Sequence, residues 1–595
     1  MLPRQYLSNE PVPSDFLTSA VYGGVLMILL NPKAYKDRNY PDARSKEIML
    51  KTIDWFENKG LAAIKEDYHN KTFTNDFAEF VKEERIFETL FLPKGYGEDP
   101  KQHYSTYKMF EFSEICGFYS SSYWYMYHVS TLGLDPVFLG DNEEAKHRAA
   151  AKLKENPLCA FGLSEREHGA DIYSSEMTLY PKNDGTYSAQ GSKYYIGNGN
   201  EAGIVTVFGK MVDTNDYVFF VVDSAHEKYE CVQNVIACDQ MYVSEFKLHD
   251  YPITDAEILS RGQKAWDDML NTINICKFNI GTASIGLCTH SLYESLNHAA
   301  KRNIFGKYVT EFPHIKQLFF DAYIRTVAMK LFGLRATDYM RAASPQDRRY
   351  LLFNPLMKMK VAIQGEIVHE LIWDVLAAKG FEKDQFFEHA SVQIKGMPKL
   401  EGTKHVNMAL MAKLIPNYMF NPKDYPKVQR QNGAENDDFL FNQGPTKGYG
   451  KIQFHDYMPI FESLDLPNVT LFMKQIELYK QLLMDSGADL MSQMANFDFL
   501  YALGEIFCVI PYAQLIVESA KMEGIEDDIL DSIFDVFVRD MSRYALDLAM
   551  KPSSTERQQK LCKEMVMKPV VNQERCERVI NDHIYALVDA YTMTP

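Results

Sequence analysis

The sequence predicts a mainly α-helical protein with a central β domain. Charged and apolar residues recur at helical spacing near both ends of the chain, whereas turn residues divide the stretch between them into short Val-, Phe- and Tyr-rich runs. At 595 residues, the chain is also too long for one typical domain. The predicted units are an N-terminal helical domain (1–155), a middle β domain (156–260), a helical bundle (261–420), a linker or long loop (421–455) and an additional C-terminal helical domain (456–595).

Helical spacing in the N-terminal domain is clearest in Ser45–Trp55 and Asp76–Leu92. The aromatic run Phe118–Tyr127 predicts a buried helix, with the wall of a ligand pocket as the alternative. Val21–Leu30 is apolar but spans about half of the roughly 20 residues that a membrane-spanning helix needs. We therefore expect a core helix there and no integral membrane segment.

The middle domain contains three clear strand candidates, Val205–Met211, Tyr217–Val222 and Tyr242–Leu248, which are rich in β-branched and aromatic residues. Asn183-Asp184-Gly185 is typical of a hairpin turn. A β unit between helical domains leaves a cleft in which a planar cofactor could lie, although periodicity alone does not identify the cofactor.

In the bundle, the small residues of Gly281–Gly286 permit close helix packing. The stretch 421–450 is rich in Pro, Gly, Asn and charge, which is typical of a linker. Two apolar stripes follow at helical spacing, and they predict core packing rather than a partner-binding surface. Their members are Phe472, Ile476, Tyr479 and Leu483 in the first stripe, and Leu530, Ile533, Phe534, Phe537 and Met541 in the second.

Composition excludes several functional classes. An apolar fraction of 46% predicts folded cores, and the net charge of −17 argues against nucleic acid as the main partner, because phosphate binding needs clustered basic charge. The same charge disfavours electrostatic binding to anionic lipid. Nine cysteines without a CxxC pair indicate reduced thiols, and the first residues lack the composition of a signal peptide, so we expect a cytoplasmic protein.

Four segments carry the candidate chemistry, and in this order they resemble the acyl-CoA dehydrogenase family of flavoproteins. They are Phe161–Asp171, Gly191–Gly199, Arg302–Lys307 and Lys399–Thr403. The resemblance extends over about 155–420. It implies an N-terminal helical domain, a middle β-barrel domain and a C-terminal helical bundle, with FAD as the cofactor and an acyl-CoA thioester as the substrate.

The resemblance assigns roles in FAD binding to several residues. Ser164 supplies a hydroxyl and backbone donors to the flavin pyrimidine edge, and Tyr195 replaces the usual tryptophan beside the ring. Gly197 replaces a threonine or serine at the N5 edge, while Arg302 binds the pyrophosphate. The complete predicted set is Phe161, Leu163, Ser164, Tyr195, Ile196, Gly197, Arg302, Phe305, Thr403 and His405.

The resemblance makes Glu401 the base that removes the proton alpha to the thioester. Phe381 precedes it by 20 positions, which is the family spacing. The thioester carbonyl is polarised by hydrogen bonds, one of them from the backbone of the base itself. The residues predicted to bind substrate are Ala170, Asn274, Lys277 and Gly402, with Lys277 in the place of an arginine and able to serve a phosphate as a point charge.

A metal site is the alternative interpretation of Glu165, Glu167, His168 and Asp171. The histidine is alone in a loop-like region, so we expect no metal. As an alternative, Glu401 and Arg302 could be ordinary surface residues at helix ends that have no catalytic or binding role. Four motifs in the family order argue against a chance match.

The 194 residues after Glu401 resemble the extension of very-long-chain acyl-CoA dehydrogenases. The resemblance implies fatty-acid β-oxidation, a homodimer, and an electron-transfer flavoprotein as the electron acceptor. Two alternatives keep the fold: an acyl-CoA oxidase that uses oxygen, and a catalytically inactive relative that binds flavin or DNA. Gly197, Asp374 and Pro313 differ from the residues usual in the family, and these differences keep the inactive alternative open.

Overall fold

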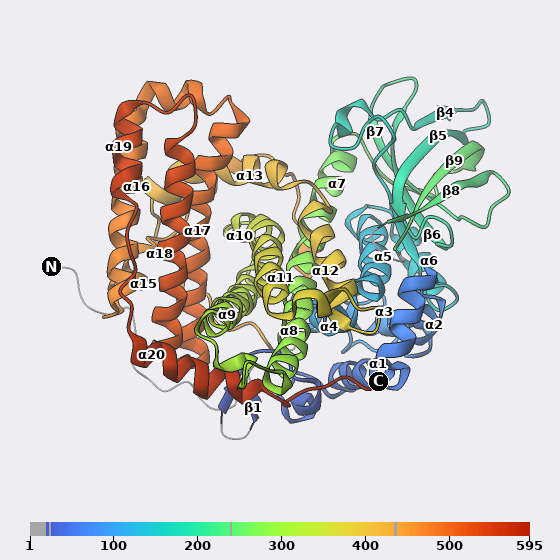
Figure 1. The fold of residues 1–595 in the computed structure, drawn as a ribbon. Coiled ribbons are helices and arrows are strands. Elements are labelled where there is room, and N and C mark those ends of the chain that lie inside the picture. Colours follow the sequence, from blue (N-terminus) through green and yellow to red (C-terminus); the bar gives the residue numbers. More distant parts are fainter. Residues whose placement is uncertain (1–19, 23–24, 238–240, 434–436) are drawn as a thin grey trace.

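A computed structural model describes residues 20–22, 25–237, 241–433 and 437–595. Figure 1 shows one large sheet at one side of the molecule, the C-terminal helices at the opposite side and the helical bundle between them, and the predicted fold class is confirmed. The N-terminal helices are α1 (Ala43–Asn70), α2 (Asn75–Glu83), α3 (Ile86–Leu90), α4 (Thr106–Tyr119), α5 (Ser121–Leu139) and α6 (Glu143–Lys152).

One prediction for this region is wrong, and two predicted helical segments are each divided in two. The apolar run Val21–Leu30 is not a core helix, because its described part includes residues of two antiparallel strands, β1 (Ala20–Tyr22) and β2 (Val25–Met27). A short apolar run fits a strand as well as a helix. The Asp76–Leu92 segment divides at Arg85, which adopts a positive φ of 53°. The aromatic run is interrupted at Ser120, whose side chain caps α5.

The helices α4 and α5 form the centre of the molecule. Every residue of both helices is buried, including the charged Lys108, Glu111 and Glu114 of α4. Gly133 allows α5 to pack directly on the sheet, since a Cβ there would lie 2.4 Å from the backbone nitrogen of Ala160. This contact places α5 against the edge of the β domain where the candidate site lies.

The main sheet has eight strands in the order β10-β7-β6-β4-β5-β9-β8, with β3 paired in parallel to β6. The predicted turn Asn183–Gly185 joins β4 and β5, which pair antiparallel. The strands are β3 (Cys159–Gly162), β4 (Thr178–Pro181), β5 (Tyr187–Gly197), β6 (Ile204–Met211), β7 (Tyr217–Val222), β8 (Tyr229–Ala237), β9 (Met241–Ile253) and β10 (Ile258–Arg261).

The helical bundle follows the sheet. As predicted, the small residues of α8 permit close packing: a Cβ at Gly281 would lie 2.4 Å from the carbonyl oxygen of Met357, and one at Gly286 would lie 2.3 Å from that of Glu114. The elements are α7 (Gly262–Cys276), α8 (Phe278–Lys301), β11 (Asn303–Ile304), β12 (Lys307–Tyr308), α9 (Pro313–Arg341), α10 (Tyr350–Leu356), α11 (Ala362–Leu376), α12 (Phe386–Gly396), α13 (Lys404–Ala412) and α14 (Ile415–Phe420).

The stretch 421–450 has little regular structure in its described part, but it is fastened to the bundle. Asp437 accepts hydrogen bonds from the Arg341 Nε atom at 2.8 Å and from the Thr106 backbone at 2.5 Å. The helices beyond it are α15 (Met458–Glu462), α16 (Pro467–Gln493), α17 (Phe497–Glu523), α18 (Asp527–Ala549), α19 (Glu556–Glu564) and α20 (Gln573–Arg578).

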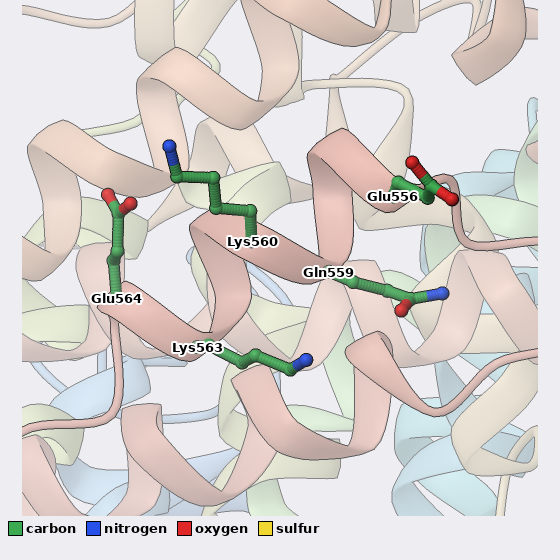
Figure 2. Close-up of a pocket in the computed structure, with 5 residues that line it drawn as sticks. All are labelled: Glu556, Gln559, Lys560, Lys563 and Glu564. Atoms are coloured by element: carbon green, nitrogen blue, oxygen red, sulfur yellow. The ribbon is translucent and has the colours of Figure 1, made fainter.

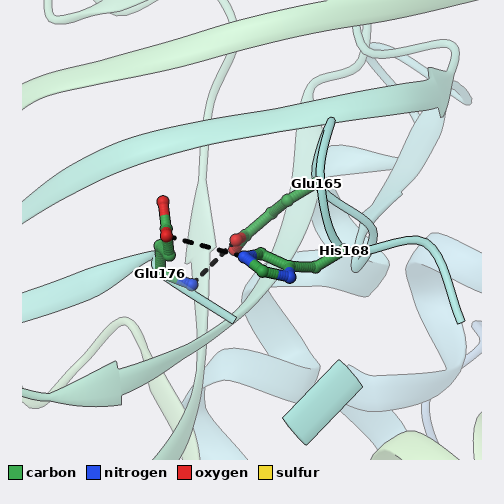
Figure 3. A group of neighbouring side chains, drawn as sticks. All are labelled: Glu165, His168 and Glu176. Atoms are coloured by element: carbon green, nitrogen blue, oxygen red, sulfur yellow. Dashed lines mark hydrogen bonds and ion pairs between the residues drawn. The ribbon is translucent and has the colours of Figure 1, made fainter. Parts of the chain in front are cut away.

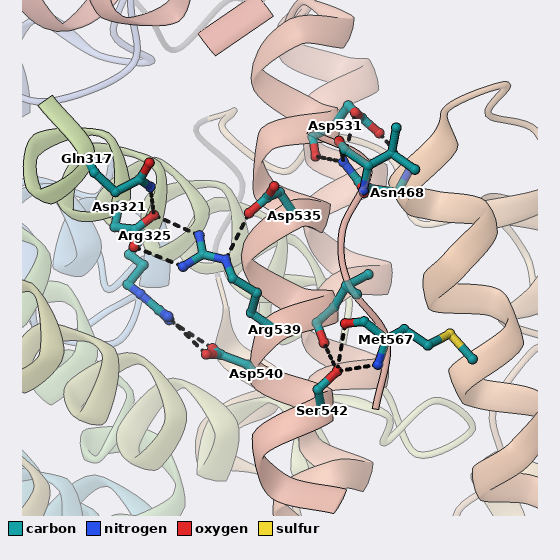
Figure 4. Close-up of polar contacts among 12 residues, drawn as sticks. Gln317, Asp321, Arg325, Asn468, Asp531, Asp535, Arg539, Asp540, Ser542 and Met567 are labelled. Atoms are coloured by element: carbon teal, nitrogen blue, oxygen red, sulfur yellow. Dashed lines mark hydrogen bonds and ion pairs between the residues drawn. The ribbon is translucent and has the colours of Figure 1, made fainter. Parts of the chain in front are cut away.

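Two ion pairs, of which the first is buried and the second partly exposed, dock these C-terminal helices on the bundle, as Figure 4 shows. Arg325 of α9 donates to both carboxylate oxygens of Asp540 on α18, at 2.8 and 2.9 Å. Arg539 likewise forms a bidentate pair with Asp321, donating to its two carboxylate oxygens at 2.9 and 2.7 Å. Among the described residues, α17 alone is long and apolar enough to cross a membrane, but 89% of its most apolar window is buried inside the fold.

The outer surface of the C-terminal region carries a shallow depression on α19, at the edge of the molecule away from the main sheet (Figures 1 and 2). Its lining is made of mostly exposed, mostly charged side chains from a single helix: Glu556, Gln559, Lys560, Lys563 and Glu564. Such a solvated helix face offers no enclosed binding site.

Candidate active site

Glu401 lies in the short loop between Lys399 and α13, and the backbone there is strained. Its φ is +48°, and that of Gly402 is +88°. Non-glycine residues seldom adopt a positive φ, and they do so where the surrounding structure enforces it. Here Lys358 donates to the carbonyl oxygens of Pro398 and Gly402. Asn407 donates to the Gly402 carbonyl at 3.2 Å, so the loop is held from two sides.

The carboxylate of Glu401 is fixed by His128, a residue of α5 that the sequence analysis did not single out. The Nε2 atom of His128 is hydrogen-bonded to Glu401 Oε1, and the imidazole stacks on Trp124 at 4.4 Å between ring centroids. Glu401 is 12% exposed at its side chain, and its Oε2 atom has no hydrogen-bond partner among the described residues. One carboxylate oxygen is therefore oriented, and the other is available to accept a proton.

A polar face of α5 continues from His128 towards α7. Thr131 and Asp135 follow His128 at helical spacing, and the Cys276 thiol of α7 donates to Asp135 Oδ2 at 3.1 Å. All of these side chains are buried. Burial raises the pKa of the Asp135 carboxyl to about 7, and the nearby Glu401 charge adds to that effect. The surroundings of Glu401 are thus polar on this side rather than aliphatic.

Two buried lysines surround the same carboxylate. Lys277, which links α7 to α8, is 2% exposed, and burial lowers its pKa to about 8 against the opposing attraction of Glu401. Lys358 has its pKa lowered to about 7 by burial, again opposed by Glu401. Desolvation outweighs attraction at both positions, since neither lysine forms an ion pair within 4 Å among the described residues.

The β domain presents the second half of the site. The Ser164 hydroxyl donates to the Tyr194 carbonyl at 2.8 Å, and the Tyr194 amide donates to the Ser164 carbonyl at 3.0 Å. These bonds place Phe161–Ser164 beside Tyr195, whose φ is +70° and whose side chain is 49% exposed. Phe161 and Leu163 are partly exposed, and Ile196 is buried. The structure therefore brings the predicted flavin-ring residues together.

Gly197 lies against α5, and the structure explains why this position lacks a hydroxyl side chain. A Cβ there would lie 2.8 Å from the Tyr125 hydroxyl and 2.8 Å from a Val129 methyl group. The adjacent Asn198 was not predicted as a site residue. Its amide donates to the Met126 carbonyl at 2.8 Å and to other groups of α5 and β3. Asn198 therefore anchors the end of β5 to α5.

Glu165 and Lys193 form a buried ion pair at 2.7 Å, and the lysine also donates to the Leu163 carbonyl. Glu165, His168 and Glu176 lie close enough to suggest a metal centre, as Figure 3 shows. However, the Glu165 oxygens already accept hydrogen bonds from Lys193, from Ser175 and from the backbone amides that follow it. These donors stabilise the buried Glu165 carboxylate, so its burial requires no metal ion.

The remaining predicted residues lie at the surface of the single chain. Arg302, Phe305, Thr403, His405 and Ala170 are exposed, and the Phe305 side chain is 94% exposed. Arg302 has no ionic partner among the described residues. No hydrogen bond or ion pair within the described residues links these five side chains to Glu401, so the structure does not join them to the proton-accepting site.

Of the residues predicted to bind substrate, some lie at the Glu401 site and others lie away from it. Lys277 and Gly402 lie at the Glu401 site, whereas Asn274 is partly exposed and its backbone carbonyl accepts a hydrogen bond from Asn354 at 2.9 Å. Lys277 is enclosed beside the Glu401 carboxylate, and its contact with a CoA phosphate stays a prediction.

Residues 264–415 match the family model described as "Acyl-CoA dehydrogenase, C-terminal domain". The matched range contains Lys277, Arg302, Phe305 and Glu401 in family order. The predicted resemblance to the acyl-CoA dehydrogenase family is confirmed, with this part of the chain matching the family model itself. The match includes both α7, which leads to Lys277, and the loop that carries Glu401.

Curated relatives of the family are distant in sequence. A short-chain-specific acyl-CoA dehydrogenase from Megasphaera elsdenii is 23% identical over 239 residues, which cover 39% of this chain and 61% of the relative. The caffeyl-CoA reductase–Etf complex subunit CarC from Acetobacterium woodii is 23% identical over 307 residues, which cover 48% of this chain and 79% of the relative.

A solved family member shares the whole architecture. The acyl-CoA dehydrogenase from Bacillus anthracis, solved in complex with FAD, superposes with a TM-score of 0.72 at 15% sequence identity. The superposition covers 93% of this chain and 97% of that protein, so the C-terminal extension is part of the shared fold. At this identity the likeness establishes the fold and leaves the activity to be argued from the site.

Proposed function

We propose that this protein is an FAD-dependent acyl-CoA dehydrogenase that converts acyl-CoA thioesters to trans-2-enoyl-CoA in fatty-acid β-oxidation. One structural relationship carries the proposal. Helix α5 contacts the flavin-edge candidate Gly197 through Tyr125 and Val129, and it holds Glu401 through His128. One stretch of a buried helix therefore contacts both Glu401, the predicted proton acceptor, and Gly197, which would lie at the hydride-accepting edge of a bound flavin.

The residues present fit a flavin dinucleotide. On the β side, Phe161, Leu163 and Tyr195 leave apolar surface uncovered next to Ser164, which suits a flat ring with a polar edge. Arg302 offers a cation to the pyrophosphate. FAD is the group that the family and its flavin-bound members support. When bound, FAD supplies the acceptor for the hydride that leaves the beta carbon.

The chain's own residues handle the proton. Glu401 Oε2, which lacks a partner, takes the proton from the alpha carbon, while His128 keeps Oε1 in place. The electron pair of that C–H bond moves into the new carbon–carbon double bond as the beta hydride departs. The buried ammonium groups of Lys277 and Lys358 stabilise negative charge on Glu401 before the transfer.

The proposal extends to partners. The name of the CarC relative places that protein in a complex with an electron-transferring flavoprotein, and we propose such a flavoprotein as the electron acceptor here. We also propose a homodimer, in which a second copy covers the exposed Arg302 and Phe305. The eight described cysteines are all unpaired, in keeping with a reducing, cytoplasmic location.

The test is the visible spectrum of the FAD-loaded protein during anaerobic addition of saturated acyl-CoAs. The proposal expects the flavin absorbance to bleach with at least one thioester, and Glu401→Gln to slow bleaching by about four orders of magnitude or more, as is typical when an essential base is lost. The control is Glu462→Gln, which makes the same change at an exposed carboxylate.

A flavin that no thioester bleaches would contradict the proposal. Peroxide formation at the rate of substrate oxidation, without any added acceptor, would replace the dehydrogenase assignment with an oxidase. Full activity of Glu401→Gln would remove the proton-accepting role from this residue.

A further inference from the structure

The proton-accepting site contains more buried positive charge than a simple alkyl substrate requires. Lys277 and Lys358 are both buried within electrostatic range of Glu401. Asp135 also lies close enough to Glu401 for that carboxylate to affect its pKa, and its carboxyl accepts the Cys276 thiol hydrogen rather than an ammonium hydrogen. Neither lysine has a carboxylate partner within 4 Å among the described residues.

Lys277 is the buried lysine whose ammonium has no partner among the described residues. Lys358 donates to two backbone carbonyl oxygens of the Glu401 loop, so its ammonium is hydrogen-bonded. Lys277 is 2% exposed, and its ammonium has neither a hydrogen bond nor an ion pair to any residue in the described ranges. A buried charge without a partner costs several kcal/mol, so a site that retains one is suited to an anionic ligand.

The acyl chain reaches this part of the protein if Glu401 takes a proton from the alpha carbon. The carboxylate must lie within hydrogen-bond distance of that proton, and the carbons beyond must then pass the groups around Glu401. On the α5–α7 side, these groups are His128, Thr131, Asp135 and Cys276, which are all buried and polar. Thr131 and Cys276 already donate hydrogen bonds within this group, but His128 Nδ1 has no partner among the described residues, and a polar chain end supplies one where an alkyl chain does not.

We propose that the acyl group of the preferred substrate carries a second carboxylate, which pairs with the Lys277 ammonium. The substrate class is therefore a CoA monothioester of a dicarboxylic acid. This inference rests on the proposed function and specifies its substrate. The terminal carboxylate takes no part in bond changes: the alpha proton still goes to Glu401 and the beta hydride to the bound FAD.

The experiment compares thioesters of matched chain length on the FAD-loaded, full-length protein. Glutaryl-, adipyl- and suberyl-CoA are paired with pentanoyl-, hexanoyl- and octanoyl-CoA, and kcat/KM is measured from anaerobic bleaching. We expect the carboxylated member of at least one pair to be favoured about 10- to 100-fold, the range that one charge-assisted hydrogen bond supplies. In that pair, the carboxylated thioester also raises the Tm more than its alkyl partner does.

Variants assign the preference to Lys277. Lys277→Met is expected to remove the preference in kcat/KM and in the Tm shift, whereas Lys277→Arg keeps a cation and retains part of it. Lys413→Met is the matched control, because Lys413 is exposed and lies outside the site. If Lys277→Met fails to fold or to bind FAD, the wild-type comparison and Lys277→Arg still decide the question.

The outcomes separate this inference from the function on which it rests. Bleaching by the alkyl thioesters at rates equal to or above those of their carboxylated partners, in every pair, overturns the substrate class and leaves the dehydrogenase intact. A preference that persists in Lys277→Met overturns the role of that residue. Absence of bleaching with all six thioesters overturns the proposed function itself.

Discussion

The Nε2 atom of His128 is hydrogen-bonded to Oε1 of Glu401 across 273 positions of sequence. The imidazole is itself confined, because it is buried and stacks on Trp124. A rigid buried ring that touches only one oxygen fixes the direction of the carboxylate while leaving Oε2 without a partner. His128 therefore acts on the reaction through Glu401 and is a positioning residue.

The first prediction concerns this contact. In His128→Ala, the carboxylate of Glu401 loses its orienting partner, and we expect kcat to fall about 10- to 100-fold with little change in KM, since misplacement of a reacting group by about 1 Å has effects of that size. His128→Asn retains a hydrogen-bonding group at this position and should recover part of the loss. The measurement is the rate of anaerobic flavin bleaching at saturating thioester.

A purely structural role for His128 would give a different result. Both variants would then lose Tm and FAD content in proportion to their activity, and His128→Asn would show no selective recovery of kcat. Circular dichroism melting and flavin content per chain, measured on the same preparations, distinguish the two cases.

The order of helical and β regions could be predicted because it depends on local patterns. Periodicity identified β6 and β7 nearly to the residue, and the stripes of α16 and α18 are buried as expected. The apolar run Val21–Leu30 was misjudged because a short apolar run fits a strand as well as a helix. The Gly23-Gly24 pair within it is a turn signal that favours strands, and the prediction did not use it.

The candidate site was only partly predictable for a different reason. Glu401 and Ser164 belong to recognisable motifs, but His128 lies in an aromatic run whose pattern indicates only a buried helix. Its role depends on a contact between distant segments. The same holds for Asn198, which packs on α5, and for Lys277, whose burial could not be read from its motif.

The second prediction tests the buried pair Glu165–Lys193, which joins β5 to the segment that carries Ser164. Lys193→Met leaves the Glu165 carboxylate buried without its cation, and we expect unfolding free energy to fall by about 3–5 kcal/mol. FAD content should fall as well, since the lysine also holds the Leu163 carbonyl. The double variant Glu165→Gln/Lys193→Met removes both charges and should recover a large part of the stability. Equal losses in the single and double variants would contradict the pairing argument.

The third prediction concerns the docking of the C-terminal helices. Arg325→Leu leaves Asp540 buried without its main partner, so we expect a destabilisation of about 3–5 kcal/mol. Arg557→Leu is the control, because its pair with Asp485 is largely exposed and such pairs contribute about 0–1 kcal/mol. Denaturant unfolding measures both. Similar values for the two variants would show that the buried pair does not anchor α18 to α9.

The fourth prediction is a pH dependence of substrate binding, and its sign follows from Lys277. Burial lowers the pKa of this lysine to about 8, so in the free protein its ammonium is present below pH 8 and is lost above it. Binding a second carboxylate to Lys277 requires the ammonium form. Affinity for adipyl-CoA should therefore fall as pH rises through about 8, while affinity for hexanoyl-CoA should change much less.

Two neighbouring groups, Asp135 and Lys358, also weaken the binding of a second carboxylate as the pH rises. Asp135 has a pKa of about 7 and becomes anionic above it, which further repels an incoming carboxylate. Lys358, with a pKa of about 7, loses its positive charge as well. Because the bound carboxylate favours protonated Lys277, binding of adipyl-CoA above pH 8 should take up a proton, which a pH-indicator dye can record. In Lys277→Met, the proton uptake and the fall in affinity near pH 8 should both be strongly reduced; if both persist unchanged, another group binds the second carboxylate.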